Sequence, residues 1–323
     1  MLFKKTVLIT TLMLALASCS QSNQSSSAKE QPEATMTQSN QNQTLTFNSK
    51  AGEITIPSNI SRITVLDTNA LNTIHELGAD DKVVGLPKGT PLPRFLESFN
   101  DAKYADVGTV KDPNLERVAA TKPELILMSA RMENVVDQIK QIAPTYFVDV
   151  DYKDQFNSFK QQTLSIAEMV GKKVQAENEL KALEADIETL KQKTKGKTAL
   201  VIMVNNSKLA AYGAGSRFGN IHDLYGFTPA DPSVKVGLHG MAISYEFIAQ
   251  KNPDYLFVID RGAAITEKKD GAKQILNNAI IEKTKAAKNG HIVYLDSSNW
   301  YLMNNGLGGM KAMVKEVSDA VND

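Results

Sequence analysis

The chain has 323 residues, and its 36 Lys and Arg residues balance its 36 Asp and Glu residues. Because there is no broad excess of positive charge to hold a phosphate backbone, we expect no nucleic-acid partner. The single cysteine excludes an internal disulfide framework and any CxxC redox or zinc motif. The only long apolar run lies at the N-terminus, which excludes a multi-pass membrane protein.

The N-terminus has the features of an export signal. Two lysines precede an apolar run, residues 6–17, that is short for a membrane span. The run ends in Leu-Ala-Ser-Cys at residues 16–19, which resembles a bacterial lipobox. The resemblance implies a signal peptide at residues 1–18 and acylation of Cys19. The alternative is an ordinary signal peptide, but the lone cysteine falls where a lipobox needs it.

Residues 19–45 are expected to form a flexible, lipidated tether. Of the 26 residues from 20 to 45, 18 are Ser, Gln, Asn or Thr, and none is aromatic. Such a segment cannot bury enough apolar surface to offset the entropy that it would lose on ordering. Several acyl chains on Cys19 would hold the domain that follows to a membrane.

A repeat at an offset of 130 residues divides the rest of the chain. Residues 116–131 and 246–261 share a pattern of short helix, proline, apolar strand and arginine. The two strands, predicted near residues 125–128 and 255–259, are apolar on both faces, as buried parallel strands are. The corresponding pairs are Glu116 and Glu246, Ala119 and Ala249, Pro123 and Pro253, Glu124 and Asp254, and Arg131 and Arg261.

The repeat predicts an α/β fold of two Rossmann-like lobes with mostly parallel sheets. Apolar residues at spacings of three and four predict a long amphipathic helix between the lobes, which should permit only modest closure. We expect an N-terminal lobe at 46–173, a connecting helix at 174–196 and a C-terminal lobe at 197–323, with a ligand cleft between the lobes. Further strands are predicted at residues 63–66, 82–86, 146–150, 199–204 and 291–295.

Three arginines are candidate ligand-binding residues. Ligands of open α/β sheets lie beyond the carboxyl ends of the strands, where the repeat puts Arg131 and Arg261, one from each lobe. Arg217 lies in a glycine-rich loop after the apolar stretch 209–212. Guanidinium groups offer planar hydrogen bonds to oxyanions, so the three could converge on an anion. Alternatively, each arginine pairs with a local carboxylate.

Two loops have an unusual composition. His239 lies between glycines in residues 236–241, and Trp300 and Tyr301 lie in a polar segment that follows a predicted strand. The aromatic pair is either core packing or a binding wall. His75 and His222 both stand in helix-like segments before a glycine, and we interpret them as structural residues.

The lipobox, the tether and the two duplicated lobes resemble a class III solute-binding lipoprotein of an ABC importer. Within that class the chain is similar to the ferric-catecholate siderophore binders of the CeuE type. The resemblance covers the chain after about residue 46. The matching stretches are residues 108–116, 122–126 and 215–219 and the loops of His239 and Tyr301.

The resemblance implies that His239 and Tyr301 bind ferric iron and complete the shell of a tetradentate, two-catechol siderophore. Hard ferric iron suits phenolate oxygen, and imidazole also binds iron. Arg131, Arg217 and Arg261 would then offset the negative charge of the chelate. No intrinsic cofactor is expected, because the Fe(III) arrives as a siderophore chelate.

The resemblance also implies the partners of the chain. Glu116 and Glu246, one per lobe, would dock on a two-fold symmetric ABC permease with its ATPase, although both are also acids that a helix N-terminus favours. We expect a monomer without enzymatic activity, held in the cell envelope by its lipid and facing the periplasm or the outer face of the cytoplasmic membrane. The alternatives are a haem or cobalamin carrier, a zinc or manganese importer subunit, and an enzyme that acts on the chelate.

Overall fold

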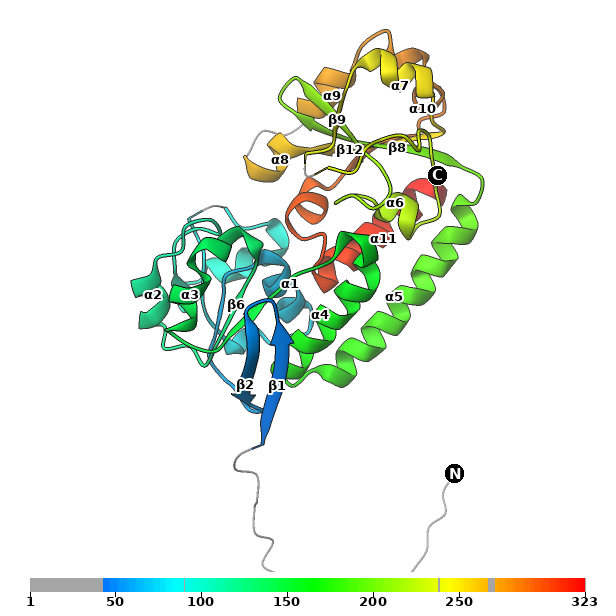
Figure 1. Cartoon of the computed structure of the whole chain (residues 1–323). Coiled ribbons are helices and arrows are strands. Elements are labelled where there is room, and N and C mark those ends of the chain that lie inside the picture. The colour runs from blue at the N-terminus through cyan, green and yellow to red at the C-terminus, as the bar shows by residue number, and fades with distance from the viewer. Residues whose placement is uncertain (1–42, 90, 238, 267–270, 323) are drawn as a thin grey trace, which may run out of the picture. The chain divides into compact units, whose positions relative to one another are not determined.

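A five-stranded parallel sheet forms the centre of the N-terminal lobe in the computed structural model, which describes residues 43–89, 91–237, 239–266 and 271–322 (Figure 1). Every neighbouring pair in this sheet is parallel. Cys19, the predicted signal peptide and residues 19–42 of the predicted tether lie outside the described residues. The strand order is β5 (Ala105–Asp106), β4 (Val83–Leu86), β3 (Ile63–Val65), β6 (Leu125–Met128) and β7 (Thr145–Phe147).

The sheet of the C-terminal lobe is mixed. β8, β12 and β13 are parallel neighbours, whereas β9 and β11 run antiparallel to the strands beside them. The chain reverses after β8 through Asn206, whose φ of 53° is in the left-handed region that asparagine tolerates. The strands are β11 (Met241–Ile243), β9 (Lys208–Tyr212), β8 (Thr198–Asn205), β12 (Tyr255–Asp260) and β13 (Ile292–Leu295) in spatial order, with β10 (Thr228–Pro229) paired to β8.

The predicted repeat is confirmed as a helix followed by a buried strand in each lobe. α2 (Leu115–Ala120) precedes β6, and α7 (Tyr245–Lys251) precedes β12. Both helices are followed by a residue with positive φ directly before the proline, Lys122 at 48° and Asn252 at 43°. The two lobes therefore stop the helix and start the strand in the same way.

A duplicated acid ties each of these strands to its neighbour. Glu124 accepts hydrogen bonds from the backbone nitrogens of Ser61 and Arg62, at 2.6 and 3.0 Å, just before β3. Asp254 accepts from the backbone nitrogen and the hydroxyl of Thr198, both at 2.8 Å, at the start of β8. The acid is thus part of what aligns the two central strands of each sheet.

One hydrophobic core continues from lobe to lobe through long helices. The connecting helix is α5 (Lys173–Thr194), and its buried stripe holds Leu180, Leu183, Ile187 and Leu190, as the spacing predicts. α5 packs on α4 (Gln155–Met169) and on α11 (Leu307–Asn322), and α11 also packs on α1 (Thr68–Glu76) (Figure 1). The mixed α/β fold with a long connecting helix is therefore confirmed.

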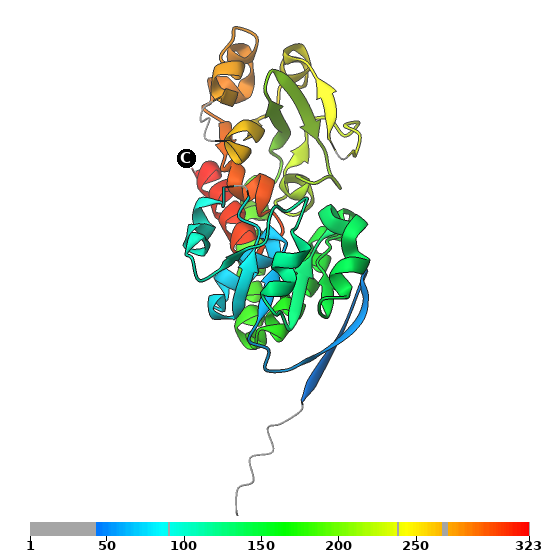
Figure 2. The same ribbon diagram turned by 90° about the vertical axis from the view of Figure 1, so that its left-hand side faces the viewer.

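An antiparallel hairpin, β1 (Thr44–Ser49) and β2 (Gly52–Pro57), precedes the first lobe; it is the blue element in Figure 2, and it packs against β7 at the edge of the sheet. Its first strand begins at Thr44 and so includes the last two residues of the predicted tether, which ends at residue 45. No helix within the described ranges is long and apolar enough to cross a membrane. The remaining helices are α3 (Val136–Lys140), α6 (Asn220–Asp223), α8 (Arg261–Ile265), α9 (Gly271–Leu276) and α10 (Lys285–Lys288).

Candidate functional site

Tyr301 lies at the centre of the candidate site, on a π-helical turn at Ser298–Leu302 that follows β13. Asp296 caps the turn, since its carboxylate accepts hydrogen bonds from the backbone nitrogens of Ser298 and Asn299. Trp300 is 1% exposed and packs edge-on against Tyr225, so it belongs to the core. The aromatic pair is therefore split, and only the half-buried Tyr301 faces the arginines.

Arg261 holds the hydroxyl of Tyr301. It is the first residue of α8, directly after β12, and its Nε donates to the Tyr301 hydroxyl at 3.0 Å. One terminal nitrogen also donates to Asn205 Oδ1 at 3.3 Å. Asn205 ends β8, the strand beside β12, so both contacts lie at the carboxyl edge of the sheet.

Arg217 contacts the face and the backbone of the same tyrosine. Its guanidinium carbon lies 4.4 Å from the centre of the Tyr301 ring, and one terminal nitrogen donates to the Tyr301 carbonyl. Asn304, just beyond the turn, donates from its side chain to the carbonyl of Arg217 at 3.2 Å. The loop after β9 thus donates a hydrogen bond to the turn after β13, and the segment that follows the turn donates one back to the loop.

The two arginines control the acidity of Tyr301. Burial alone raises the pKa of this phenol, but the hydrogen bond from Arg261 and the positive charges of both arginines outweigh burial and hold the pKa below its usual value of 10. A phenol that loses its proton more readily is a better oxygen ligand for a hard cation such as Fe(III).

The loop of His239 lies beside this group. Gly240 has a φ of 72°, and a Cβ on it would come within 2.8 Å of the buried ring of Tyr212. Tyr212 in turn packs edge-on against Phe218, next to Arg217, at 4.7 Å between ring centres. His239 itself is exposed and makes no hydrogen bond or ion pair with any residue that the structure describes.

Arg131 does not join the group. It lies in the 3-10 turn Ala130–Val135 after β6, is exposed, and forms no hydrogen bond, ion pair or ring contact within the described parts of the chain. Near the carboxyl ends of β3 and β4 the N-terminal lobe instead offers a mostly apolar pocket of about 50 Å³. Leu302, the neighbour of Tyr301, lines it together with Val65, Leu86 and Pro87.

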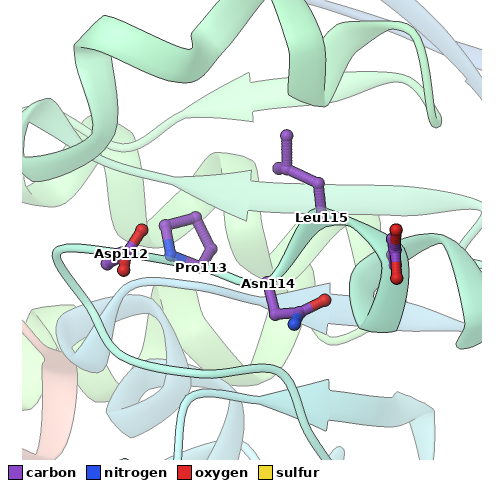
Figure 3. Close-up of a pocket in the computed structure, with 5 residues that line it drawn as sticks. Asp112, Pro113, Asn114 and Leu115 are labelled. Carbon is purple, nitrogen blue, oxygen red and sulfur yellow. The ribbon is translucent and has the colours of Figure 1, made fainter.

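Glu116 and Glu246 form no hydrogen bond or ion pair with Tyr301 or its arginines, and each is exposed in the first turn of its helix. An open hollow of about 430 Å³ lies beside Glu116, and Figure 3 shows Asp112, Pro113 and Asn114 on the loop that leads into α2, whose first residue is Leu115. His75 and His222 are helix residues, as predicted. His75 bonds Asp80 at 2.9 Å, and burial lowers the pKa of His222.

Two residues of this site were not singled out from the sequence. Asn205 could have been found, because it directly follows a buried strand run and so stands at the carboxyl edge of the sheet. Tyr212 ends an apolar stretch, and no pattern in the sequence separates it from an ordinary core residue. Across residues 43–322, apart from the undescribed gaps, no cluster of three or more His, Cys, Asp or Glu side chains could hold a bare metal ion.

Comparison with known proteins gives a family and several relatives. The periplasmic binding protein family matches residues 63–299, a range that contains Arg131, Arg217, His239 and Arg261. The petrobactin-binding protein YclQ of Bacillus subtilis is 42% identical over 268 residues, which cover 82% of this chain and 84% of YclQ. The ferric-anguibactin-binding protein FatB of Vibrio anguillarum is 30% identical over 273 residues, with 82% and 84% covered.

Solved structures are similar over the same region. The crystal structure of YclQ gives a TM-score of 0.83 at 40% identity and covers 87% of this chain and 100% of its own. The periplasmic catecholate-siderophore binding protein VctP of Vibrio cholerae gives a TM-score of 0.80 at 28% identity, with 86% and 100% covered. The likeness therefore extends over both lobes and the connecting helix.

Proposed function

Because the chain belongs to the periplasmic binding protein family, we propose that it binds a ferric siderophore outside the cytoplasmic membrane and delivers it to an ABC permease for iron uptake. The family is one of binding proteins, which confirms the expectation of a binding protein and not an enzyme. The observation that carries the proposal is Tyr301, a phenol of lowered pKa held between Arg217 and Arg261.

The charge of this group suits an anionic iron chelate. Fe(III) bound by two doubly ionised catechols has a net charge of about −1 before other groups are counted. Arg217 and Arg261 supply positive charge where the chelate would lie, and guanidinium donors suit catecholate oxygens. Relatives that are named for petrobactin, anguibactin and catecholate siderophores support this class of ligand.

His239 and Tyr301 would complete the coordination of the iron. A chelate with four donor atoms leaves two octahedral positions, which a phenolate and an imidazole can fill. The support is that the His239 loop packs beside the Arg217 loop, and that His239 is exposed and makes no competing hydrogen bond to a described residue. Arg131 would approach the chelate from the N-terminal lobe, where it is exposed.

The lipid anchor and the transporter contacts belong to the same proposal. Acylation at Cys19 would tether the domain to the membrane, and acyl labelling of a Cys19→Ser variant tests that step. A monomer would present Glu116 and Glu246 to the two halves of a permease with its ATPase.

The experiment compares two probes, a ferric chelate with two catechols and one with three. Tyr301→Phe removes only the donor oxygen, and His239→Ala removes the other donor. Each should weaken binding of the two-catechol probe by about tenfold or more and shift its visible charge-transfer band, because a metal–ligand bond is lost. A hexadentate chelate has no free position, so its binding should change far less.

Tyr152→Phe is the matched control, since Tyr152 is an exposed tyrosine on the N-terminal lobe. It should bind both probes as the unchanged protein does. If Tyr301→Phe and His239→Ala lost equal affinity for both probes, with the band unmoved, neither residue would be an iron ligand.

A further inference from the structure

A carboxylate lies directly behind the turn that carries Tyr301. Glu316, on the last helix α11, accepts a hydrogen bond from the backbone nitrogen of Asp296 at 2.7 Å and another from the indole nitrogen of Trp300 at 2.8 Å. Asp296 lies just before the turn, and Trp300 is the middle residue of the turn. One side chain therefore fastens two points of the segment that presents Tyr301.

The surroundings of Glu316 make this attachment firm. The ring of Trp300 is almost fully buried and packs against Tyr225, which is also fully buried. Burial raises the pKa of Glu316, while the hydrogen bonds from Trp300 and Asp296 act in the opposite direction. The indole nitrogen of the buried Trp300 would lose its acceptor if Glu316 changed, and an unsatisfied buried donor is costly.

The helix that carries Glu316 is itself fixed to the other lobe. Five residues earlier, Lys311 forms ion pairs with Glu76 of α1 and Glu179 of α5, both at 2.6 Å. At the start of α11, the backbone nitrogen of Gly309 donates to Asn72 of α1 at 2.9 Å. Glu316 thus links the tyrosine turn to a helix that is anchored at several other points.

We propose that Glu316 is a positioning residue for the ligand site: by holding Asp296 and Trp300, it fixes where the Tyr301 hydroxyl meets the bound iron. This inference rests on the proposed function, because it assigns Tyr301 to the iron. Arg217 and Arg261 hold Tyr301 itself, through its carbonyl and its hydroxyl, whereas Glu316 holds the backbone just before the turn and the buried Trp300.

The test uses Glu316→Gln in the full chain, with a ferric two-catechol chelate as the probe. Glutamine keeps the shape but has only one acceptor oxygen, so one of the two donors would face an amide NH₂ group. Asp319→Asn is the matched control, because it also removes a carboxylate from α11, but one whose only ion pair among the described residues is with the exposed Lys315. Trp300→Phe is a second variant, which removes one donor and keeps an aromatic ring.

We expect Glu316→Gln and Trp300→Phe each to weaken binding about three- to tenfold and to shift the charge-transfer band, while Asp319→Asn changes neither. In a Tyr301→Phe background the same changes should cause no further loss, because there is no phenolate left to position. Melting temperatures report whether each variant is folded, and Trp300→Phe carries the test if Glu316→Gln does not fold.

Two results would overturn the proposal. One is a loss of the same size with and without the Tyr301 hydroxyl, which would mean that Glu316 acts only on stability. The other is a Glu316→Gln variant that behaves like Asp319→Asn while Tyr301→Phe still binds weakly; the iron coordination would then stand without the positioning role. If Tyr301→Phe itself bound normally, the coordination would be wrong and the positioning role with it.

Discussion

Two arginines hold Tyr301, and each contacts a different part of the residue. Arg261 contacts the phenol oxygen and so acts on its proton, whereas Arg217 covers the ring and binds the main-chain carbonyl. A hydrogen bond that favours the ionised phenol competes with burial, which favours the neutral one. The acidity of Tyr301 therefore depends on Arg261.

Changing Arg261 to Met should make binding more dependent on pH. The pKa of Tyr301 would rise, and because the phenol must lose its proton to bind iron, binding would cost more at lower pH. We expect affinity for the ferric two-catechol chelate to fall by the same factor, about tenfold, near pH 6 and near pH 7, where the phenol must lose its proton in both proteins, and by less near pH 9, as the pH approaches the lowered pKa of Tyr301 in the unchanged protein. Titrations at the three pH values measure the effect.

Arg131→Met is the control for this experiment. It removes the same charge, but Arg131 makes no contact with Tyr301, so any deficit should be the same at each pH. A deficit for Arg261→Met that also stayed constant would show that Arg261 acts on the charge of the chelate and not on the tyrosine.

The sequence pattern picks out these residues one by one, but it does not predict which of them lie together in the fold. The offset of 130 residues pairs Arg131 with Arg261, and both follow matched strands. It says nothing of Arg217, which has no counterpart in the first lobe and yet shares Tyr301 with Arg261. Loops between distant strands meet through tertiary contacts, and a one-dimensional pattern does not record them.

The duplicated helix and strand are the elements that both lobes share. α2 and α7 each begin with a capped turn in which the glutamate is the second residue, and each is followed by the acid that ties the central strands together. The acids Glu124 and Asp254 therefore serve the fold. Glu116 and Glu246 are exposed and form no ion pair with any described residue, which is consistent with the proposed docking on a permease.

Replacing Glu116 and Glu246 together with Lys should block iron uptake and leave chelate affinity unchanged. The charge reversal would repel a basic surface on the permease, and neither residue contacts Tyr301 or its arginines. Uptake of labelled ferric chelate by cells and titration of the purified variant measure the two effects. Loss of affinity in the purified protein would place the glutamates in the ligand site instead.

Elements with a local signal were predicted well, and elements defined by distant pairing were not. β6 is predicted to the residue, and α5 to within one residue at its start and two residues at its end, because continuous apolar runs and a regular apolar stripe are local signals. The hairpin β1–β2 and the antiparallel strand β11 were missed. Their short, half-exposed strands gain stability from their partners, which a single segment does not reveal.

At the scale of the whole molecule, α11 joins the two lobes. Its N-terminal glycines allow close packing on α1, since a Cβ on Gly308 would lie 2.7 Å from a carboxylate oxygen of Glu76. Lys311 then bridges Glu76 and Glu179, which belong to α1 and α5. The hydrophobic core runs through the same helices. These contacts explain why lobes joined by a helix should move little when the chelate binds.

Lys311→Met should lower the free energy of unfolding by about 1–3 kcal/mol, because it leaves two partly buried carboxylates without their cation. Burial lowers the pKa of Lys311, but Glu179 and Glu76 outweigh burial and raise the pKa above its ordinary value of 10.5. The ion pairs therefore stabilise the fold at neutral pH, and this stabilisation is lost only as the pH rises past the raised pKa. Lys315→Met, four residues on and exposed, should change stability by less than about 0.5 kcal/mol. Urea unfolding near pH 7 compares the variants, and equal effects at the two lysines would mean that the bridge between the lobes contributes no more than an exposed ion pair.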